Sequence, residues 1–387
     1  MITKALEGYY RLYDEQGAAF SKCMNHVLGN GRGQYLVFRA SAGTGKTVTA
    51  NAVIAYAAQF NIKITACAYT GRAAARMNAV TCHSLLYEPI LDENGDLIRW
   101  GRKDPRAIRE SVGDCIMVDE GSMIPQSMHQ ELSDIGVPII YIGDDSQLDP
   151  VEPDKADNAQ IFNVMVSLDA DVVSMVNMRR FHPDSGIAKI GERLREDNVI
   201  RRINSDDVKF ITKRNINVEF FKTNNVDVVI CGSNATRKRL TRTYRCGNGW
   251  EWDAGPAIGE RLMCLKNDVI NNVRIYNGEL YTVMFVTPTP NGYSRYMLYS
   301  EEADKSVNVD ILDSTWEDET PPPNKRAGKS QKFGHFTFGY CMTAFKAQGS
   351  SFQNVLFYDE DVSFFTDQRK YRYTGITRAA KKLWVTI

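Results

Sequence analysis

One loop of this sequence has the residue types and spacing that bind phosphate. Residues 40–47 read Ala-Ser-Ala-Gly-Thr-Gly-Lys-Thr and lie between a strand-like run and a segment of helical period. Successive backbone N–H groups at such a helix start form an anion nest, Lys46 reaches β- and γ-phosphates, and the Thr47 hydroxyl can ligate Mg²⁺. Only Ala40 departs from the pattern GxxxxGK[ST]. We therefore predict that the nucleotide is bound by Ala42, Gly43, Thr44, Gly45, Lys46 and Thr47.

Two further polar groups follow apolar runs. Asp119 and Glu120 end the run 114–120, and Gln147 follows the run 137–145. Because the carboxyl ends of parallel strands meet at one sheet edge, these groups are expected near the bound phosphates. Asp119 then holds Mg²⁺ directly or through water, Glu120 orients the attacking water, and Gln147 contacts the γ-phosphate or that water. A solvated strand end or a plain turn is the alternative for each segment alone.

Two more motifs lie about 200 residues or more beyond the loop. They are Met342–Gly349 (MTAFKAQG) and Tyr373–Ala379 (YTGITRA). An enzyme that phosphorylates small molecules seldom needs a second such domain, whereas in motor ATPases an arginine of the facing domain stabilises charge on the transferred phosphoryl group. This arrangement favours a motor ATPase.

The elements that must position these residues alternate between strands and helices. In the first half, strand-like runs at 34–40, 63–69, 114–120 and 137–145 alternate with helices from Lys46 and Gly71. This order predicts an α/β fold with a parallel sheet. Residues 84–113 break the rhythm and read as an inserted hairpin, with DENGD as its turn.

The second half repeats the α/β theme. Runs at 226–233, 354–360 and 382–387 accompany helices from Asn234 and near 368–380, and the alternating runs of 261–335 predict a small inserted β-barrel. The predicted domains are 1–83 with 114–175, the insertion 84–113, 176–260 with 336–387, and the barrel 261–335.

The ordered motifs resemble superfamily 1 helicases, and within them the 1B group that includes the Dda-type phage helicases and RecD-type enzymes. The resemblance covers nearly the whole chain and rests on ten motifs: LYDEQGAAF around Gln16, AGTGKT (42–47), AYTGRAA (68–74), TCHSLL (81–86), VDEGSM (118–123), GDDSQLDPV (143–151), NMRRF (177–181), YNGELYTV (276–283), TAFKAQG (343–349) and YTGITRA (373–379).

This resemblance implies two RecA-like domains that sandwich ATP, with single-stranded DNA across their top. Gln16 matches the adenine-reading glutamine, and Arg180 and Arg378 are implied to reach the γ-phosphate from the second domain. Arg179 is the adjacent alternative to Arg180. The hairpin corresponds to a strand-separating pin and residues 261–335 to an SH3-like barrel.

The same resemblance implies contacts with the DNA backbone. They are assigned to Thr70, His83, Ser84 and Thr343, although a buried structural role is an equal alternative for each residue. Two aromatic residues depart from the family pattern, Tyr69 for a proline and Phe345 for a histidine. Each can stack on a base or pack in the core.

Composition bounds the remaining classes. The chain has 387 residues, with 47 Lys and Arg against 47 Asp and Glu, and eight scattered cysteines without a CxxC pair. These features favour two or three globular domains with reduced thiols and disfavour a disulfide framework or zinc site. Charge is uneven, because residues 201–245 hold 11 basic against 4 acidic residues and residues 299–320 hold 8 acidic residues against one lysine. The basic run either lines a DNA channel or is a solvated face.

The leading hypothesis is an ATP-dependent DNA helicase that uses ATP and Mg²⁺ and moves 5′ to 3′. The expected partners are single-stranded DNA and its junctions with duplex, together with replication or recombination proteins. No run of about 18 apolar residues suits a membrane, so we expect a cytoplasmic monomer in a bacterium or a phage-infected cell. The alternatives are an ATPase that loads or remodels proteins on DNA without unwinding, and a P-loop kinase.

Overall fold

The chain divides into two compact units, which are described separately. The computed structural model describes residues 12–29, 31, 33–91, 97–149, 162, 171–178, 180–182, 184–319, 321–322, 332–363, 365 and 367–387. The units are Met1–His182 and Pro183–Ile387. The division falls seven residues beyond the predicted start of the second α/β domain at residue 176.

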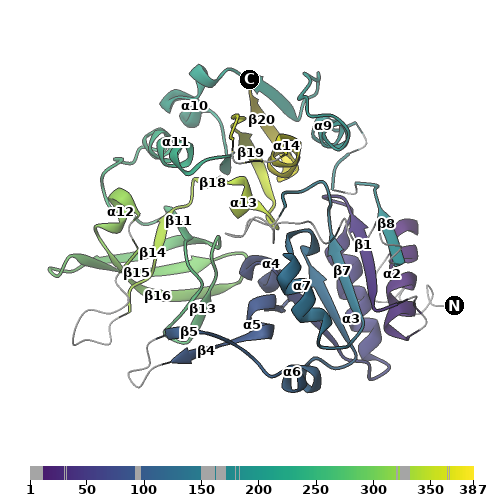
Figure 1. The fold of residues 1–387 in the computed structure, drawn as a ribbon. Helices are drawn as coiled ribbons and strands as arrows, with labels where there is room; N and C mark the ends of the chain where they lie inside the picture. The colour runs from purple at the N-terminus through teal and green to yellow at the C-terminus, as the bar shows by residue number, and fades with distance from the viewer. Residues whose placement is uncertain are drawn as a thin grey trace. The chain divides into compact units, whose positions relative to one another are not determined.

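The first unit is built on the predicted parallel sheet (Figure 1). Its six strands pair in parallel in the order β3, β2, β6, β7, β1, β8. Their bounds are β1 (Tyr35–Ala40), β2 (Ile64–Ala68), β3 (Val80–Thr81), β6 (Cys115–Asp119), β7 (Ile139–Gly143) and β8 (Asp171–Met175). The strand β1 lies between β7 and β8, so the loop that follows it opens at the carboxyl edge of the sheet, as predicted.

Helices cover both faces of this sheet. Strand alternation sends Leu36 and Phe38 into one apolar cluster with α2 (Asp14–Val27) and α3 (Lys46–Ala58). Val37 enters the opposite cluster with α5 (Cys82–Leu86), α6 (Pro105–Val112) and α7 (Gln126–Ser133). The short helix α4 (Gly71–Arg76) follows β2, and the 3₁₀ turn η1 (Gly121–Met123) follows β6.

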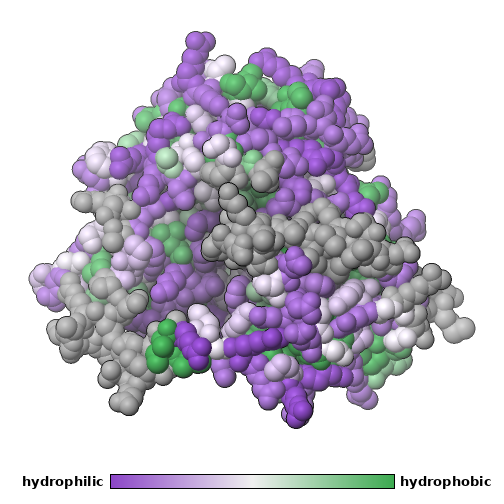
Figure 2. Space-filling view, viewed as in Figure 1, coloured by the Kyte–Doolittle hydropathy of each residue, from purple (hydrophilic) through white to green (hydrophobic). Residues whose placement is uncertain are grey.

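The predicted hairpin is confirmed as an antiparallel pair. It consists of β4 (Tyr87–Leu91) and β5 (Leu97–Arg102), with Tyr87 opposite Arg102 and Pro89 opposite Trp100. The expected turn DENGD at 92–96 lies outside the described residues. Ile98 and Trp100, two residues apart on one face of β5, are 63% and 60% exposed. Hydrophobic residues are visible at the surface over this hairpin (Figure 2).

The second unit contains another parallel sheet, in the order β18, β10, β19, β20, β9. Its strands are β9 (Val208–Ile211), β10 (Val228–Cys231), β18 (Cys341–Thr343), β19 (Phe352–Phe357) and β20 (Ala379–Thr386). Helices α10 (Val218–Thr223) and α11 (Asn234–Gly247) lie on one side of it, and α9 (Gly186–Leu194) and α14 (Gln368–Ile376) lie on the other (Figure 1). The short α13 (Ala344–Ala347) follows β18, and the 3₁₀ turn η3 (Lys213–Asn215) follows β9.

A carboxylate closes the corner between β10 and α11. Glu360 Oε1 accepts hydrogen bonds from the backbone N–H groups of Gly232 (2.6 Å) and Ser233 (2.7 Å), and the Thr236 hydroxyl donates to Oε2 (2.6 Å). The carboxylate therefore caps the helix at its positive end.

The runs of 261–335 form an antiparallel sheet together with β17, which lies just past the predicted boundary at residue 335, in the order β16, β15, β14, β11, β17. These strands are β11 (Arg261–Cys264), β14 (Leu280–Pro288), β15 (Tyr293–Ser300), β16 (Lys305–Leu312) and β17 (Phe336–Phe338), accompanied by the pair β12 (Asp268–Ile270) and β13 (Val273–Ile275) and by the turn α12 (Thr315–Asp318). The strands are confirmed, whereas closure into an SH3-like barrel stays a prediction.

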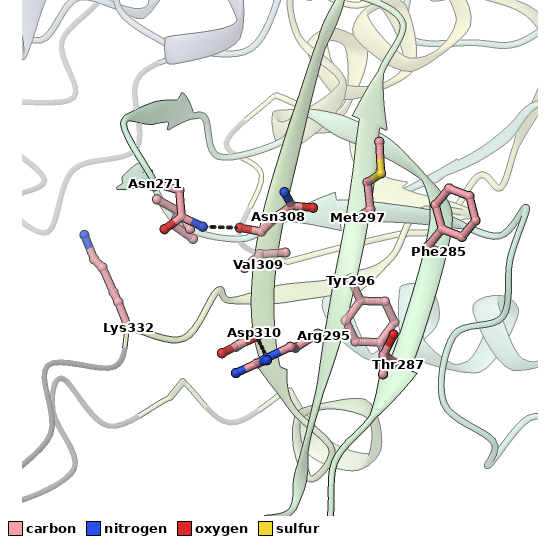
Figure 3. Close-up of a pocket in the computed structure, with 11 residues that line it drawn as sticks. Asn271, Phe285, Thr287, Arg295, Tyr296, Met297, Asn308, Val309, Asp310 and Lys332 are labelled. Carbon is pink, nitrogen blue, oxygen red and sulfur yellow. Dashed lines mark hydrogen bonds and ion pairs between the residues drawn. The ribbon is translucent and has the colours of Figure 1, made fainter.

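One face of this sheet is hollowed (Figure 3). The hollow has a volume of about 630 Å³, and Phe285 of β14 and its cross-strand partner Met297 of β15 lie side by side in its lining. The Arg295 guanidinium pairs with Asp310 at 3.3 Å, which neutralises its charge.

Among the described helices, none is both long and apolar enough to cross a bilayer.

Candidate nucleotide site and nucleic-acid contacts

The loop between β1 and α3 depends on two glycines with left-handed backbone. Gly43 has φ +80° and Gly45 has φ +93°. A Cβ on Gly45 would lie 2.3 Å from Gln16 Nε2, and one on Gly43 would lie 2.9 Å from Arg180 Cβ. Both positions therefore need glycine for backbone conformation and for space. Within the described residues, the buried Ser41 hydroxyl of this loop has no hydrogen-bond partner.

The structure brings the predicted lysine and acid together. Lys46 begins α3, and Glu120 directly follows β6, two strands away from β1 across β7. Lys46 Nζ donates to Glu120 Oε1 at 3.3 Å, and these side chains are 15% and 3% exposed. Glu120 has φ +53°, a left-handed conformation that is costly for a residue with a Cβ and is typical of functional sites.

Asp119 carries a perturbed carboxyl group beside this pair. Burial raises the pKa of Asp119 to about 6, although the nearby Lys46 ammonium opposes the shift. The Glu120 carboxylate raises the pKa further by repulsion, and the Glu120 backbone N–H donates to Asp119 Oδ1 at 2.9 Å. Two buried acids thus share one nearby lysine, an environment that favours an added cation.

Gln147 is also placed at this edge, in the segment after β7. It is 1% exposed, and its Nε2 donates to Asp144 Oδ2 at 3.3 Å. Its Oε1 has no hydrogen-bond partner among the described residues. The side chain is therefore oriented through one end of its amide while the other end retains an unused acceptor.

Gln16 contacts the phosphate-binding loop itself. Its Nε2 donates to the Thr44 carbonyl at 3.1 Å, and its Oε1 accepts from the Tyr13 backbone N–H at 3.2 Å. This bonding joins the start of α2 to the loop. The implied role in reading adenine stays a prediction.

Arg180 lies in the first unit, so the predicted origin in the second domain is corrected. Its backbone N–H donates to the Gly43 carbonyl at 2.9 Å, which fixes it on the loop. Glu15 in α2 holds the same segment by accepting from the backbone N–H of Asn177 at 3.0 Å. Arg179, the adjacent alternative, lies outside the described residues.

Arg378 lies in the second unit, between α14 and β20. It is 4% exposed, and its guanidinium donates to the carbonyls of Thr374 (3.0 Å) and Ser350 (3.2 Å) and to the Thr377 hydroxyl (3.2 Å). These bonds fix the side chain. Contact with a nucleotide stays a prediction.

The predicted DNA contacts of the first unit lie near one another at helix starts. Thr70 caps α4 by accepting from the Ala73 N–H at 3.2 Å, and the hydroxyl of Ser84 lies 2.8 Å from that of Thr81, which caps α5. The exposed ring of His83 lies between Tyr69 and Tyr87, with centroid distances of 5.8 and 6.0 Å. Tyr69 thus presents part of its ring at this surface and packs with the rest against the core.

In the second unit, Thr343 and Phe345 have different surroundings. Thr343 ends β18 and is 7% exposed. Phe345 stacks on Phe365 at 5.5 Å, and Phe365 stacks on Tyr371 at 4.7 Å. The packing alternative therefore describes Phe345 in this structure.

Sequence reasoning missed several residues that position the site. Asp144 orients Gln147, Glu15 holds the segment before Arg180, and Arg39 at the end of β1 pairs with Asp145 at 2.5 Å. Asp144 and Asp145 stood in a quoted motif and offered a signal. Glu15 also stands in a motif, beside Gln16, but its contact had no local signal because its partners are more than 160 residues away.

Comparison with known proteins adds independent findings. The model of the AAA domain family matches residues 11–213, and the UvrD-like helicase C-terminal domain matches residues 338–386. A relative from Psychrobacter sp. (strain PRwf-1), the ATP-dependent DNA helicase Pif1, is 28% identical over 197 residues. That match covers 47% of this chain and only 29% of the length of the relative.

Solved structures of Pif1 helicases share the fold. One, of two Pif1 helicases coordinating at forked double-stranded DNA, has a TM-score of 0.61 at 16% identity and covers 98% of this chain and 92% of its own. Another, Pif1 from Bacteroides with ADP-AlF3 and single-stranded DNA, has a TM-score of 0.60 at 16% identity, with 97% and 92% covered. These similarities show that the chain shares their fold.

Proposed function

The chain belongs to the AAA domain family, and we propose that it is an ATP-dependent DNA helicase that moves along a single strand. The observation that carries the proposal is the 3.3 Å contact between Lys46 of the loop and Glu120 at the end of β6. This contact supports the proposed pairing of a cation that binds phosphate with a carboxylate that orients water. The second α/β unit carries Arg378 in its motif, and a motor ATPase uses such an arginine to stabilise charge on the transferred phosphoryl group.

In the proposed reaction, backbone N–H groups of the loop and the Lys46 ammonium bind the β- and γ-phosphates of ATP. When the Lys46 ammonium donates its hydrogen bonds to phosphate instead of to Glu120, the Glu120 carboxylate can accept a proton from the attacking water. Gln147 offers its unused Oε1 to that water. Arg180, held at Gly43, and Arg378, from the second unit, are the proposed cations for charge on the γ-phosphoryl group.

The residues at this edge fit a divalent cation. A buried Asp119 whose pKa is about 6 is stabilised by a nearby positive charge, and Thr47, which follows Lys46 in the first turn of α3, offers a hydroxyl. Thr47 and Asp119 would hold Mg²⁺. The ion would neutralise phosphate charge.

The finer assignment is to superfamily 1B. The named relatives are Pif1 helicases and do not support the Dda-type and RecD-type enzymes specifically, which the sequence motifs resemble. The superfamily 1B assignment implies 5′ to 3′ movement, a strand-separating role for the hairpin β4–β5, and an SH3-like character for the sheet of 261–335. Named relatives that are Pif1 helicases support this superfamily assignment. Thr70, His83, Ser84 and Thr343 are the proposed backbone contacts to DNA.

The test is ATP hydrolysis with and without single-stranded DNA, followed by strand displacement from duplexes with either a 5′ or a 3′ tail. A helicase of this polarity hydrolyses ATP faster with DNA and unwinds from the 5′ tail. Stimulation without displacement would favour the loading or remodelling ATPase. Unwinding only from the 3′ tail would overturn the polarity, and no stimulation would overturn the DNA motor itself.

A further inference from the structure

The basic helix α11 divides its cations between two environments. Arg237 and Arg245 are 2% and 1% exposed and form ion pairs with Glu319 and Glu260. Lys238, Arg239 and Arg242 lie on the outer side of the helix instead. The concentration of positive charge noted in residues 201–245 therefore includes a structural part and a solvent-facing part.

Aromatic rings hold the solvent-facing part in place. The Arg239 guanidinium lies 5.3 Å from the ring centroid of Tyr358, and its Nη2 donates to the Tyr358 hydroxyl at 3.1 Å. Lys213 Nζ lies 5.4 Å from the same ring. Arg242 lies 4.8 Å from the ring of Trp252. We call these five residues the α11 stripe.

The charges of this stripe are not neutralised by ion pairs. Among the described residues, no carboxylate forms an ion pair with Lys213, Arg239 or Arg242, whereas Arg372, Arg369 and Lys305 of the same unit each have one. Lys238 beside the stripe shares Glu319 at 3.7 Å. Cation–π contacts fix the direction of the side chains without cancelling their charge. The result is an ordered set of three cations, although the exposed Glu251 and Asp253 flank Trp252 at one end of it. Such a set attracts a polyanion.

The stripe also has a defined direction in its unit. The helix begins at Asn234, three residues after Cys231, which pairs in register with Thr343 at the carboxyl edge of the sheet. At 1.5 Å per residue, Arg242 lies about 12 Å along the helix from that start. The stripe therefore leads away from the edge where Thr343 is proposed to contact DNA.

We propose that the α11 stripe binds the phosphate backbone of DNA beyond the segment held at Thr343. This inference rests on the proposed function and adds a second contact region. DNA suits the stripe better than an acidic protein segment because the Trp252 residue is 50% exposed beside Arg242 and provides a ring surface on which a base can stack. Tyr358 adds a second ring to the same surface.

The test compares Arg239→Gln/Arg242→Gln with the control Arg201→Gln/Arg202→Gln. The control removes the same charge from exposed positions of the same unit. Affinity is measured against salt for a short single-stranded oligonucleotide and for a forked DNA. Losing two phosphate contacts lowers the slope of log K against log[salt] by about 1.4–1.8, so between 50 and 200 mM salt the wild type loses roughly 7- to 12-fold more affinity than the variant. This difference is expected for the fork and not for the oligonucleotide.

The outcomes separate this inference from the proposed function. A wild-type protein without DNA-stimulated ATPase defeats the proposed function. Normal stimulation with equal fork slopes in the stripe and control variants defeats only the stripe, and would direct attention to an acidic protein partner. A direct check is tryptophan fluorescence: fork binding should change the emission of the wild type more than that of Trp252→Phe, and equal changes would contradict contact at Trp252.

Discussion

Removal of Lys46 tests the electrostatics of the nucleotide site apart from its chemistry. Lys46→Ala removes the ammonium that pairs with the buried Glu120 and lowers the pKa of the buried Asp119, and leaves Arg76 as a weaker cationic influence on Asp119. Breaking a fully buried pair costs about 3–5 kcal/mol. Because Lys46 retains 15% side-chain exposure, water screens part of this effect, and we expect a loss of about 2–3 kcal/mol in the free energy of unfolding.

Glu120→Gln should have the opposite profile. The substitution removes one of two adjacent negative charges, so the free energy of unfolding should stay unchanged or rise. ATP and DNA binding should persist, since the lysine and the loop are intact. Turnover should fall by at least ~100-fold, as expected for loss of a base. In Lys46→Ala/Glu120→Gln, the destabilisation due to the lysine should shrink to under about 1 kcal/mol, because the uncompensated charge has gone.

The assay combines thermal unfolding of the four proteins with nucleotide binding and ATP turnover. For a unit of this size, 2–3 kcal/mol corresponds to a shift in Tm of roughly 4–12 °C. A Lys46→Ala protein as stable as the wild type, or one equally destabilised with and without Glu120, would refute the electrostatic reasoning. Near-normal turnover of Glu120→Gln would refute the role of the base.

Three further predictions concern single groups. Arg378→Ala should keep DNA binding without nucleotide but lose DNA-stimulated ATPase by ~10³- to 10⁵-fold, measured as turnover at saturating DNA; normal stimulated turnover would exclude the role. Mg²⁺-dependent nucleotide affinity should fall about tenfold per pH unit below about pH 6, because the Asp119 carboxyl is protonated there. Asp119→Asn should make the affinity nearly independent of pH in this range. A variant with the same pH dependence as the wild type would contradict metal binding at Asp119. Gly45→Ala should weaken nucleotide binding at least ~10-fold by displacing Gln16, whereas Gly136→Ala, at φ +75° with open space, should leave affinity unchanged.

Local patterns were sufficient for much of the fold. The loop before Lys46 and the acids after β6 could be placed because each depends on one strand and the turn that follows it. The helix α2 also had an available signal, since Ala19, Phe20, Cys23, Met24 and Val27 repeat at helical spacing. The sequence signal for the edge strand β8 was weaker, because its residues are mostly half-buried and do not alternate clearly between buried and exposed positions.

Other features depend on pairing between distant segments. The bonds of Gln16 to Thr44 and of Arg180 to Gly43 join positions that no local periodicity connects. The motif that contains Arg180 could therefore be identified, but Arg180 was assigned to the second domain although it lies in the first unit. The split of α11 into buried and exposed cations similarly follows from Glu319 and Glu260, which lie on other elements.

The carboxylate of Glu360 has a consequence for nucleotide stoichiometry. The corner between β10 and α11 has the same strand, turn and helix order as the corner between β1 and α3, yet Glu360 already accepts its N–H groups. A phosphate arriving there would lose those donors and meet a like charge. We therefore expect that ATP does not bind between β10 and α11. Although the chain has two strand–turn–helix segments of this kind, it should bind one nucleotide rather than two.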